Sequence, residues 1–345
     1  MSRSAPPGDG RRAGGVTSKA VECIDYDDLD EQREIFDAEV RVSPHVDGFC
    51  ASTDWILPAA RGLEAGRRPW IWRGTHGWVA LSIHQDPQGA RVGLALESMW
   101  GLSCPVVGRD RAALAAEFAR TIMVHRSQWE ALVLSGLAPE DPFLGYFADA
   151  LVEHAHLRYA DRALRVVASL EGGFDGYLAR RSSPFRRGLR RASQKAEQAG
   201  LELVEVRADD RRSAEEIYER CVAVERESHK GRKLDGLLGS SMQEFYRDMS
   251  LRLSDREAMR VRFARLDDRD VGFLLGADWE RSYRALQCSY DAKYSELSIG
   301  KLLQQAQIRA LCEEGVLRYD LGSDVPYKRS WGESVETGLR LLVIR

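Results

Sequence analysis

Runs of apolar residues divide the last quarter of the chain into strands and a helix. Two such runs, 272–276 and 283–288, are separated by a polar turn and are typical of adjacent strands. Apolar residues at helical spacing begin after Ser298 and end before Gly315, and a short strand pattern follows at 317–321. The order strand, turn, strand, helix, strand predicts a small sheet with a helix packed against it.

The chain as a whole shows two successions of the same kinds of element. In the second half the pattern predicts helices at 184–199, 213–227 and 240–252 and strands at 201–206, 259–266, 271–277 and 281–288. In the first half it predicts strands at 21–24, 70–73, 78–83, 91–99, 131–134 and 164–170 and helices at 29–42 and 110–123. The fold class we predict is α/β (α+β), with two similar domains that each hold a mixed, mainly antiparallel sheet flanked by helices.

Length and composition set the expected domain boundaries. At 345 residues the chain is about twice the usual domain size, so two domains are expected. We place the first at 21–170 and the second at 171–345. Residues 1–20 are rich in Pro, Gly, Ser and Arg, a composition that cannot bury a core, and we expect a disordered tail there.

Charge and cysteine usage exclude several function classes. The net charge of −3 is too small to indicate DNA as a partner, and no apolar run approaches the ~20 residues that span a bilayer. The N-terminus lacks a secretory signal, and the six scattered cysteines read as reduced thiols, so we expect a cytoplasmic protein. His154 and His156 have no third ligand at suitable spacing, so no metal site is predicted.

The start of the helix at 298–311 has the features of an anion site. A serine, an apolar residue, a glycine and a lysine stand where free backbone N–H groups and the helix dipole both face an incoming negative charge. A strand that leads into such a helix is the geometry that holds a pyrophosphate. The alternative is an ordinary helix capped by the Ser298 side chain.

Several short motifs carry a resemblance to a known family. They are Tyr290-Asp291, Ser298-Ile299-Gly300 with Leu302-Leu303, Tyr319-Asp320-Leu321-Gly322, Tyr327-Lys328 with Trp331, and, upstream, Glu227-Ser228-His229-Lys230-Gly231 and a basic helix with Arg186 and Arg190. In this order they resemble the acetyltransferase superfamily with the GNAT fold, and more narrowly the CelD/BcsL-type (BioF2-like) acyltransferases, relatives of the FemAB aminoacyl transferases. The resemblance covers 170–345 well and 20–165 weakly. His229 stands where the family usually has tryptophan.

The resemblance implies tandem GNAT-like domains and direct transfer of an acyl group, by default acetyl, from a coenzyme A thioester to an acceptor amine in a cleft between them. The residues it implies for the thioester are Gln287, Cys288, Ser298, Ile299, Gly300 and Lys301. Those it implies for the acceptor are Glu227, Lys230, Arg186, Arg190, Tyr290, Lys328 and Trp331. The acceptor is a small molecule or a peptide. Neither the acceptor's identity nor the oligomeric state follows from the sequence.

Three residues are candidates for proton transfer. Asp320 is a carboxylate in an apolar strand, where burial would raise its pKa and suit it to a base; the alternative is a structural carboxylate paired with Arg318 or Lys328. Tyr327 stands where family members often place the tyrosine acid. His229 is matched to proton transfer at neutral pH, or else it complements a helix dipole.

The remaining patterns leave alternatives open. The first half has Trp100-Gly101-Leu102-Ser103-Cys104-Pro105 at the place of the anion turn, and Pro105 removes a donor, so we expect this half to shape the cleft only. The basic stretch 180–195 suits a carrier phosphate, an acidic substrate or an acyl carrier protein, or it is a solvated face. Rival functions are an acyl-carrier-protein- or aminoacyl-tRNA-dependent FemAB-like transferase acting on a peptide or cell-envelope precursor, and a non-catalytic binding module.

Overall fold

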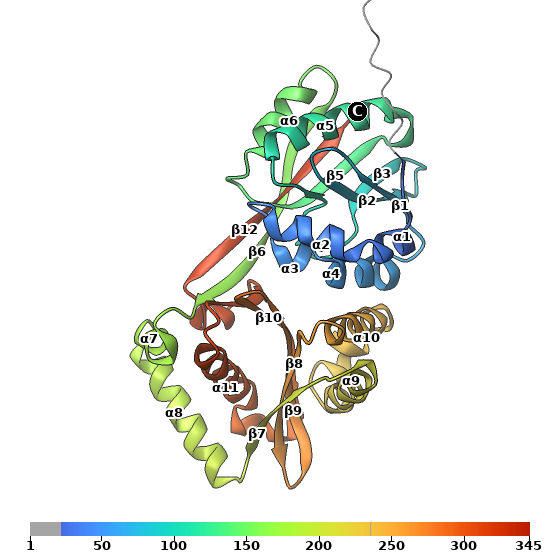
Figure 1. The fold of residues 1–345 in the computed structure, drawn as a ribbon. Helices are drawn as coiled ribbons and strands as arrows, with labels where there is room; N and C mark the ends of the chain where they lie inside the picture. The colour runs from blue at the N-terminus through green and yellow to red at the C-terminus, as the bar shows by residue number, and fades with distance from the viewer. Residues whose placement is uncertain (1–21, 235) are drawn as a thin grey trace, which may run out of the picture.

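The computed structural model describes residues 22–234 and 236–345, so the expected tail at 1–20 lies outside the described residues. Among these residues, twelve strands form one mixed sheet that runs through both halves of the chain (Figure 1). The strand order is β1-β2-β3-β5-β12-β6-β11-β10-β9-β8-β7, and β4 pairs with β2 beside this path. The predicted class, a mixed sheet flanked by helices, is confirmed.

The strands of the first half are β1 (Arg68–Arg73), β2 (Trp78–Gln85), β3 (Arg91–Ala95), β4 (Val106–Val107), β5 (Ala131–Leu137) and β6 (His156–Ser169). Those of the second half are β7 (Glu202–Arg207), β8 (Met259–Leu266), β9 (Arg269–Trp279), β10 (Ser282–Tyr290), β11 (Arg318–Ser323) and β12 (Ser334–Ile344). The α-helices are α1 (Tyr26–Glu31), α2 (Arg33–Val42), α3 (Gly48–Ala51), α4 (Thr53–Pro58), α5 (Arg111–Val124), α6 (Phe143–Leu151), α7 (Gly173–Ala179), α8 (Ser183–Gln198), α9 (Arg211–Arg226), α10 (Ser240–Ser254) and α11 (Ile299–Glu313). Short π- or 3₁₀-turns are η1 (Ala59–Leu63), η2 (Arg126–Gln128), η3 (Gly231–Lys233), η4 (Gly236–Leu238), η5 (Ala292–Leu297) and η6 (Lys328–Ser330).

Several expected elements have different ends in the structure. The helix expected from Ser213 begins at Arg211, because Asp210 is its N-cap: the Ser213 N–H donates to the Asp210 carboxylate, and the Asp210 N–H donates to the Ser213 hydroxyl. The helix expected at 29–42 is interrupted at Gln32, which separates α1 from α2. Of the strand expected at 21–24, only a bridge from Ile24 to Ile71 is described.

The last strand of the chain lies within the sheet of the first half. β12 pairs on one side with β5, where Leu342 is opposite Val133, and on the other with β6, where Leu342 is opposite Arg158. The long ribbon of β6 and β12 joins the two halves (Figure 1). The division of the chain at residue 170 stays a prediction, and β12 crosses it in space.

β10 and β11 are parallel neighbours over only three residue pairs. Ser282, Tyr283 and Arg284 pair with residues 318–320, and beyond them the two strands part. On its other side β10 remains paired with β9 as far as Tyr290. One edge of residues 285–290 therefore has no neighbouring strand.

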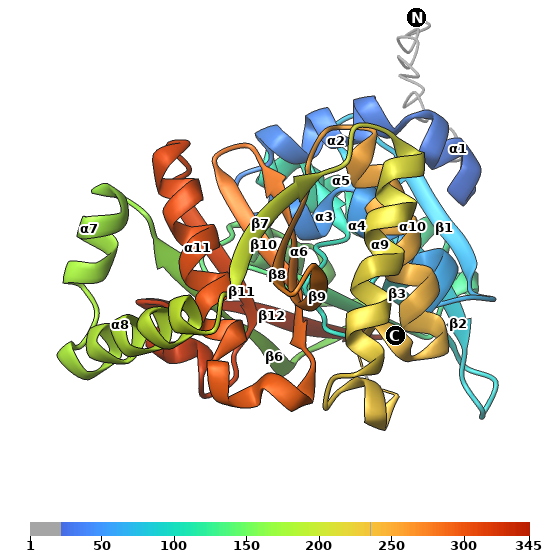
Figure 2. The ribbon, with the colours of Figure 1, turned by 90° about the horizontal axis from the view of Figure 1, so that it is seen from below.

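Helices cover both faces of the second half's part of the sheet. α7, α8 and α11 lie on one face and α9 and α10 on the other, as both views show (Figures 1 and 2). α10 also packs against α4 of the first half, where the ring of Phe245 meets the ring of Trp55 edge-on at 5.2 Å between centroids. A single apolar cluster therefore continues from one half into the other. No helix within 22–234 or 236–345 is long and apolar enough to cross a bilayer.

Candidate active site

A cavity of about 320 Å³ lies where β10 and β11 part. The two strands and the segment after β11 supply most of its lining, and the first half contributes Trp55, Trp100 and Leu102. Among the residues predicted from the sequence, the cavity brings together Lys230, Gln287, Cys288, Tyr327 and Lys328.

A chain of hydrogen bonds crosses one wall of this cavity. The Lys230 ammonium donates to the Gln287 side-chain oxygen at 3.0 Å and to the Cys288 carbonyl at 3.1 Å. The Gln287 amide nitrogen donates to the Tyr246 hydroxyl oxygen at 2.9 Å, so the hydroxyl proton of Tyr246 remains available to another acceptor. Burial raises the pKa of Tyr246 to about 12, which keeps it protonated at neutral pH. Sequence reasoning missed Tyr246, because it lies within α10 without any local motif.

Cys288 does not have the surroundings of a nucleophile. Burial raises the pKa of its thiol to about 11, although the Lys230 charge acts in the opposite direction. At neutral pH the side chain is therefore a thiol, which reacts far more slowly than a thiolate. Cys288 is a small residue of the cavity wall.

Asp320 is ionised and held by arginines. Its carboxylate accepts from Arg284 at 2.7 Å, from Arg165 at 2.8 Å and from the Gly322 backbone N–H at 2.7 Å. Burial acts to raise the pKa of Asp320, but the charges of Arg284 and Arg165 outweigh it and hold the pKa well below the usual range. The expected raised pKa is wrong. The alternative of a structural carboxylate is favoured, with different partners from those expected: Arg318 is 3.8 Å away, and Lys328 is not among its ion pairs.

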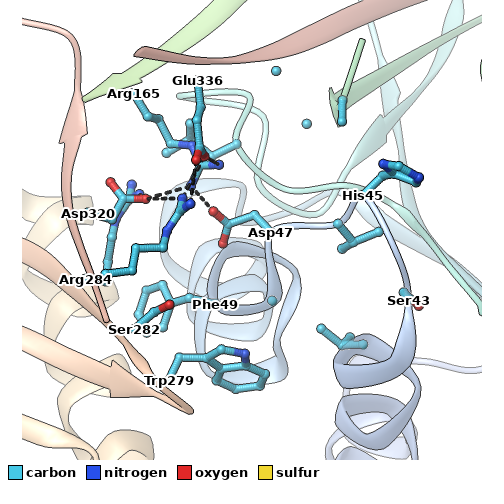
Figure 3. Close-up of a pocket in the computed structure, with 18 of the residues that line it drawn as sticks. Ser43, His45, Asp47, Phe49, Arg165, Trp279, Ser282, Arg284, Asp320 and Glu336 are labelled. Atoms are coloured by element: carbon cyan, nitrogen blue, oxygen red, sulfur yellow. Dashed lines mark hydrogen bonds and ion pairs between the residues drawn. The ribbon is translucent and has the colours of Figure 1, made fainter. Parts of the chain in front are cut away.

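A second, larger cavity of about 620 Å³ lies between the two halves. Figure 3 shows its ion-pair network, in which Arg165 stands between Asp47, Asp320 and Glu336. Leu102 and Arg284 line this cavity and also the smaller one. Arg284 is 5 % exposed, so it forms a largely buried partition between the two.

The anion turn predicted at the start of α11 is open. Ser298 has left-handed backbone angles (φ +56°), and its side chain makes no capping hydrogen bond, so the capped-helix alternative is not what the structure shows. The N–H groups of Lys301 and Leu302 donate to the Ser298 carbonyl, whereas those of Ile299 and Gly300 have no acceptor within the described residues. A Cβ on Gly300 would lie 3.8 Å from the Cys288 sulfur, which places the turn beside the free edge of β10.

Other predicted site residues lie elsewhere. His229 is exposed and outside both cavities, and Glu227 lines a separate small cavity beside Arg220 and Asp270. Trp331 is 3 % exposed in the core, where its carbonyl accepts from the Tyr177 hydroxyl, so its predicted contact with substrate has no cavity in which to occur. Tyr290 is half-buried beside Gly300.

Arg186 and Arg190 lie on α8, the outermost helix of the second half in Figure 1. Arg186 is half-buried and donates to the Leu178 carbonyl at 3.4 Å, whereas Arg190 is exposed. No three His, Cys, Asp or Glu side chains gather into a metal-binding group within 22–234 and 236–345.

The corresponding turn of the first half is filled by a carboxylate of the chain itself. Glu97 is fully buried, and its two oxygens accept from four successive backbone N–H groups: Trp100 (2.6 Å), Gly101 (3.2 Å), Leu102 (3.0 Å) and Ser103 (3.3 Å). Successive N–H groups around one oxygen pair form an anion nest. The nest of the first half therefore holds Glu97, and the loop that it fixes forms a wall of the smaller cavity.

Comparison with known proteins agrees with this geometry. Residues 183–329 match the family model described as acetyltransferase (GNAT) domain. No curated protein matches the chain. Among solved structures, the fold is similar to a conserved protein of unknown function from Bacteroides thetaiotaomicron VPI-5482, with a TM-score of 0.62 and 9 % identity over 94 % of this chain and 99 % of that one.

Two further solved structures share the fold. FemX has a TM-score of 0.62 and 10 % identity over 89 % of this chain and 95 % of its own. L-PGS from Bacillus licheniformis has a TM-score of 0.58 and 13 % identity over 90 % and 91 %. The narrower resemblance to CelD/BcsL-type proteins and the cytoplasmic location stay predictions. Residues 183–329 match a GNAT-type acetyltransferase domain, and this match supports an acyltransferase.

Proposed function

We propose that the protein transfers an acyl group from a coenzyme A thioester to an acceptor amine in the cavity between β10 and β11. The observation that carries this proposal is the parting of β10 from β11 directly beside an open helix start at Ile299 and Gly300. The free strand edge suits the amides of a pantetheine arm. The adjacent free helical N–H groups suit the phosphates attached to that arm.

The free strand edge and the turn bind different parts of the donor. Backbone groups of 285–290 can pair with the two amides of a pantetheine arm as an added strand would. The N–H groups of Ile299 and Gly300, with the dipole of α11, suit the pyrophosphate, and the charge of Lys301 lies in the same turn. Gln287 and Cys288 then lie along the arm, as the resemblance implied.

The transfer needs a proton for the departing sulfur. As the amine nitrogen attacks the thioester carbon, a C–N bond forms, the C–S bond breaks, the nitrogen loses a proton and the sulfur gains one. We assign the donation to Tyr327, which lines the cavity. The residue as a whole is 59 % exposed, but desolvation raises the pKa of its hydroxyl to about 12, so it carries its proton at neutral pH.

Asp320 has a positioning role in this proposal. Its low pKa makes it a poor acceptor for the proton of the amine. Its carboxylate instead fixes Arg284, the partition between the two cavities, in one orientation. The larger cavity lies on the far side of Arg284.

Calorimetric titration with acetyl-coenzyme A tests the donor site. We expect micromolar binding to the native protein and its loss in Gly300→Pro, which removes one of the N–H groups. Gly300→Ala is the matched control: it keeps the N–H group, and its Cβ would meet only ordinary contacts of 3.6 Å or more. Unchanged binding in the Pro variant, or no binding to the native protein, would contradict the proposal.

A carrier protein or a charged tRNA as donor is the second candidate, and the surface of α8 favours it. Arg190 and Arg191 are exposed and have no partner among the described side chains. Lys195 of the same helix lies 3.3 Å from Glu296, in the turn that leads to Ser298. Binding of such a donor should fall steeply as the salt concentration rises. Charge reversal at Arg190 and Arg191 should weaken that binding and leave acetyl-coenzyme A binding intact.

A further inference from the structure

Among the described residues, the lining of the cavity between β10 and β11 has three cationic side chains and no acidic one. The cations are Lys230, Arg284 and Lys328. Lys230 donates only to the neutral oxygens of Gln287 and Cys288, and neither lysine takes part in an ion pair within the described residues. A charge withdrawn from water is costly unless it is paired. The cavity therefore lacks a negative charge.

Arg284 leaves one edge of its guanidinium unused. Its Nη1 donates to Asp320, but the buried Nε has no hydrogen-bond partner, and no described residue accepts from Nη2. Nε and Nη2 form one side of the guanidinium, and such a side pairs with both oxygens of a carboxylate. The arginine is thus oriented by Asp320 and has a donor edge to spare.

Lys328 approaches Arg284 across a space that Gly322 leaves open. A Cβ at position 322 would lie 3.5 Å from the Lys328 ammonium and 3.8 Å from Arg284 Nη2, so both cations come within 4 Å of one point. Burial, with the charges of Arg284 and Lys230, lowers the pKa of Lys328 to about 8. Lys328, which has no ion pair among the described residues, and the unused edge of Arg284 therefore lie near enough for one negative group to contact both.

We propose that Lys328 and the free edge of Arg284 bind a carboxylate that one of the reacting substrates carries, with Lys230 adding to the positive potential. This inference rests on the proposed acyl transfer in the same cavity. The carboxylate belongs either to the far end of a dicarboxylic acyl group or to an amino acid-like acceptor. A phosphate fits less well, because the pantetheine arm must share the same space of about 320 Å³ and the pyrophosphate has its own place at α11.

Two pairs of compounds that differ only in charge show whether the acyl group or the acceptor carries the carboxylate. Succinyl-coenzyme A and butyryl-coenzyme A have acyl chains of equal length, and calorimetry gives the affinity of each. If the acyl group carries the carboxylate, the succinyl compound should bind at least about tenfold more tightly, as a charge-assisted hydrogen bond allows. If the acceptor carries it, the two affinities should agree, and acetyl transfer to free amino acids should exceed transfer to their amides by about tenfold or more in kcat/KM.

Variants at Lys328 decide whether the preference arises here. Lys328→Met should abolish whichever preference is found, and Lys328→Arg should retain most of it because the charge remains. Lys233→Met is the matched control, since Lys233 is exposed and outside the cavity. The inference is overturned if neither pair shows a preference, or if Lys328→Met leaves the preference unchanged.

Unacylated coenzyme A separates this inference from the proposed function. It should bind the native protein and Lys328→Met alike, because none of its proposed contacts involves Lys328. If it binds neither, the donor site is wrong, and stabilisation by free succinate in a thermal melt tests the cavity directly. If succinate raises the melting temperature of the native protein but not that of Lys328→Met, the carboxylate site is still supported. Equal melting temperatures of the native protein with and without succinate would contradict it.

Discussion

The backbone N–H groups of the two anion turns differ in whether the chain supplies their acceptor. Backbone N–H groups converge at Trp100–Ser103 in the first half and at the start of α11 in the second, and both groups need an acceptor. The first half supplies its own, the buried carboxylate of Glu97, and the second leaves Ile299 and Gly300 open. A built-in anion makes a fixed wall, whereas an open turn makes a binding site.

The same contrast recurs among the arginines and lysines. Arg165 and one end of Arg284 are neutralised by Asp320, a residue of the chain. Lys230, Lys328 and the other edge of Arg284 have no carboxylate partner within 22–234 and 236–345. The built-in ion pairs should therefore determine stability, and the unpaired cations should determine which ligand binds.

The largest effect on stability is expected at Asp320. Asp320→Asn would leave Arg284 and Arg165 buried without their shared charge, and breaking a buried pair costs about 3–5 kcal/mol. Because the pKa of Asp320 is lowered by folding, its contribution is present above pH ~4 and is lost as the pH falls below that value. Urea denaturation at pH 7 gives the loss directly.

Asp161 provides the comparison for Asp320. Its ion pair with Arg340 lies on β6 but is exposed, so Asp161→Asn should cost less than about 1 kcal/mol. Equal losses in the two variants would show that the network around Asp320 is not a built-in counter-charge.

A somewhat smaller loss is expected at Glu97. Glu97→Ala would remove the acceptor of four buried N–H groups, at a cost of about 3 kcal/mol, and would release the loop that carries Trp100 and Leu102 into the cavity. Donor affinity should fall with it. Glu117, whose carboxylate accepts from two N–H groups of an exposed turn, is the control, and Glu117→Ala should cost about 1 kcal/mol and leave donor affinity unchanged.

These residues also show what the sequence could predict. The helix of the open turn, the strands around it and Lys230, Gln287, Tyr327 and Lys328 were predicted because they lie in motifs of consecutive residues. Glu97 and Tyr246 were missed because their roles arise from packing between distant segments. The pKa direction of Asp320 was wrong for the same reason: Arg165 is 155 positions away along the chain.

The position of β12 in the sheet could not be predicted from the local sequence pattern either. No strand was predicted at 334–344, and the place of β12 between β5 and β6 depends on contacts with residues roughly two hundred positions earlier. The two-domain division followed the order of elements along the chain, and it stays a prediction.

We expect the proton donor, Tyr327, to lie in the second half as well. Its substitution should change the rate of the reaction. Tyr327→Phe should lower kcat about a hundredfold with little change in donor affinity, because general acid catalysis contributes to the transition state. Tyr246→Phe is the matched change at the other hydroxyl of the cavity, and it should affect kcat less. If Tyr246→Phe gives the larger loss, the proton comes from the buried hydroxyl that Gln287 orients.

The remaining prediction concerns the pH dependence of stability and rests on Asp54, a buried carboxylate that is poorly satisfied. It is 1 % exposed, neither oxygen has a hydrogen bond, and Arg256 of the second half approaches it only to 3.3 Å. Burial, partly offset by Arg256 and reinforced by Asp37, raises its pKa to about 7. The folded protein therefore holds a proton here that the unfolded chain releases near pH 4.

Stability should consequently fall as the pH rises from about 4 to about 7, by up to ~1.4 kcal/mol per unit from this residue. Asp54→Asn should flatten that slope and leave the variant more stable than the native protein at pH 8, as urea denaturation at each pH can measure. Asp149→Asn, at an exposed position on α6, should leave the slope unchanged. If Asp54→Asn keeps the native slope, Arg256 compensates this carboxylate as fully as Arg284 and Arg165 compensate Asp320.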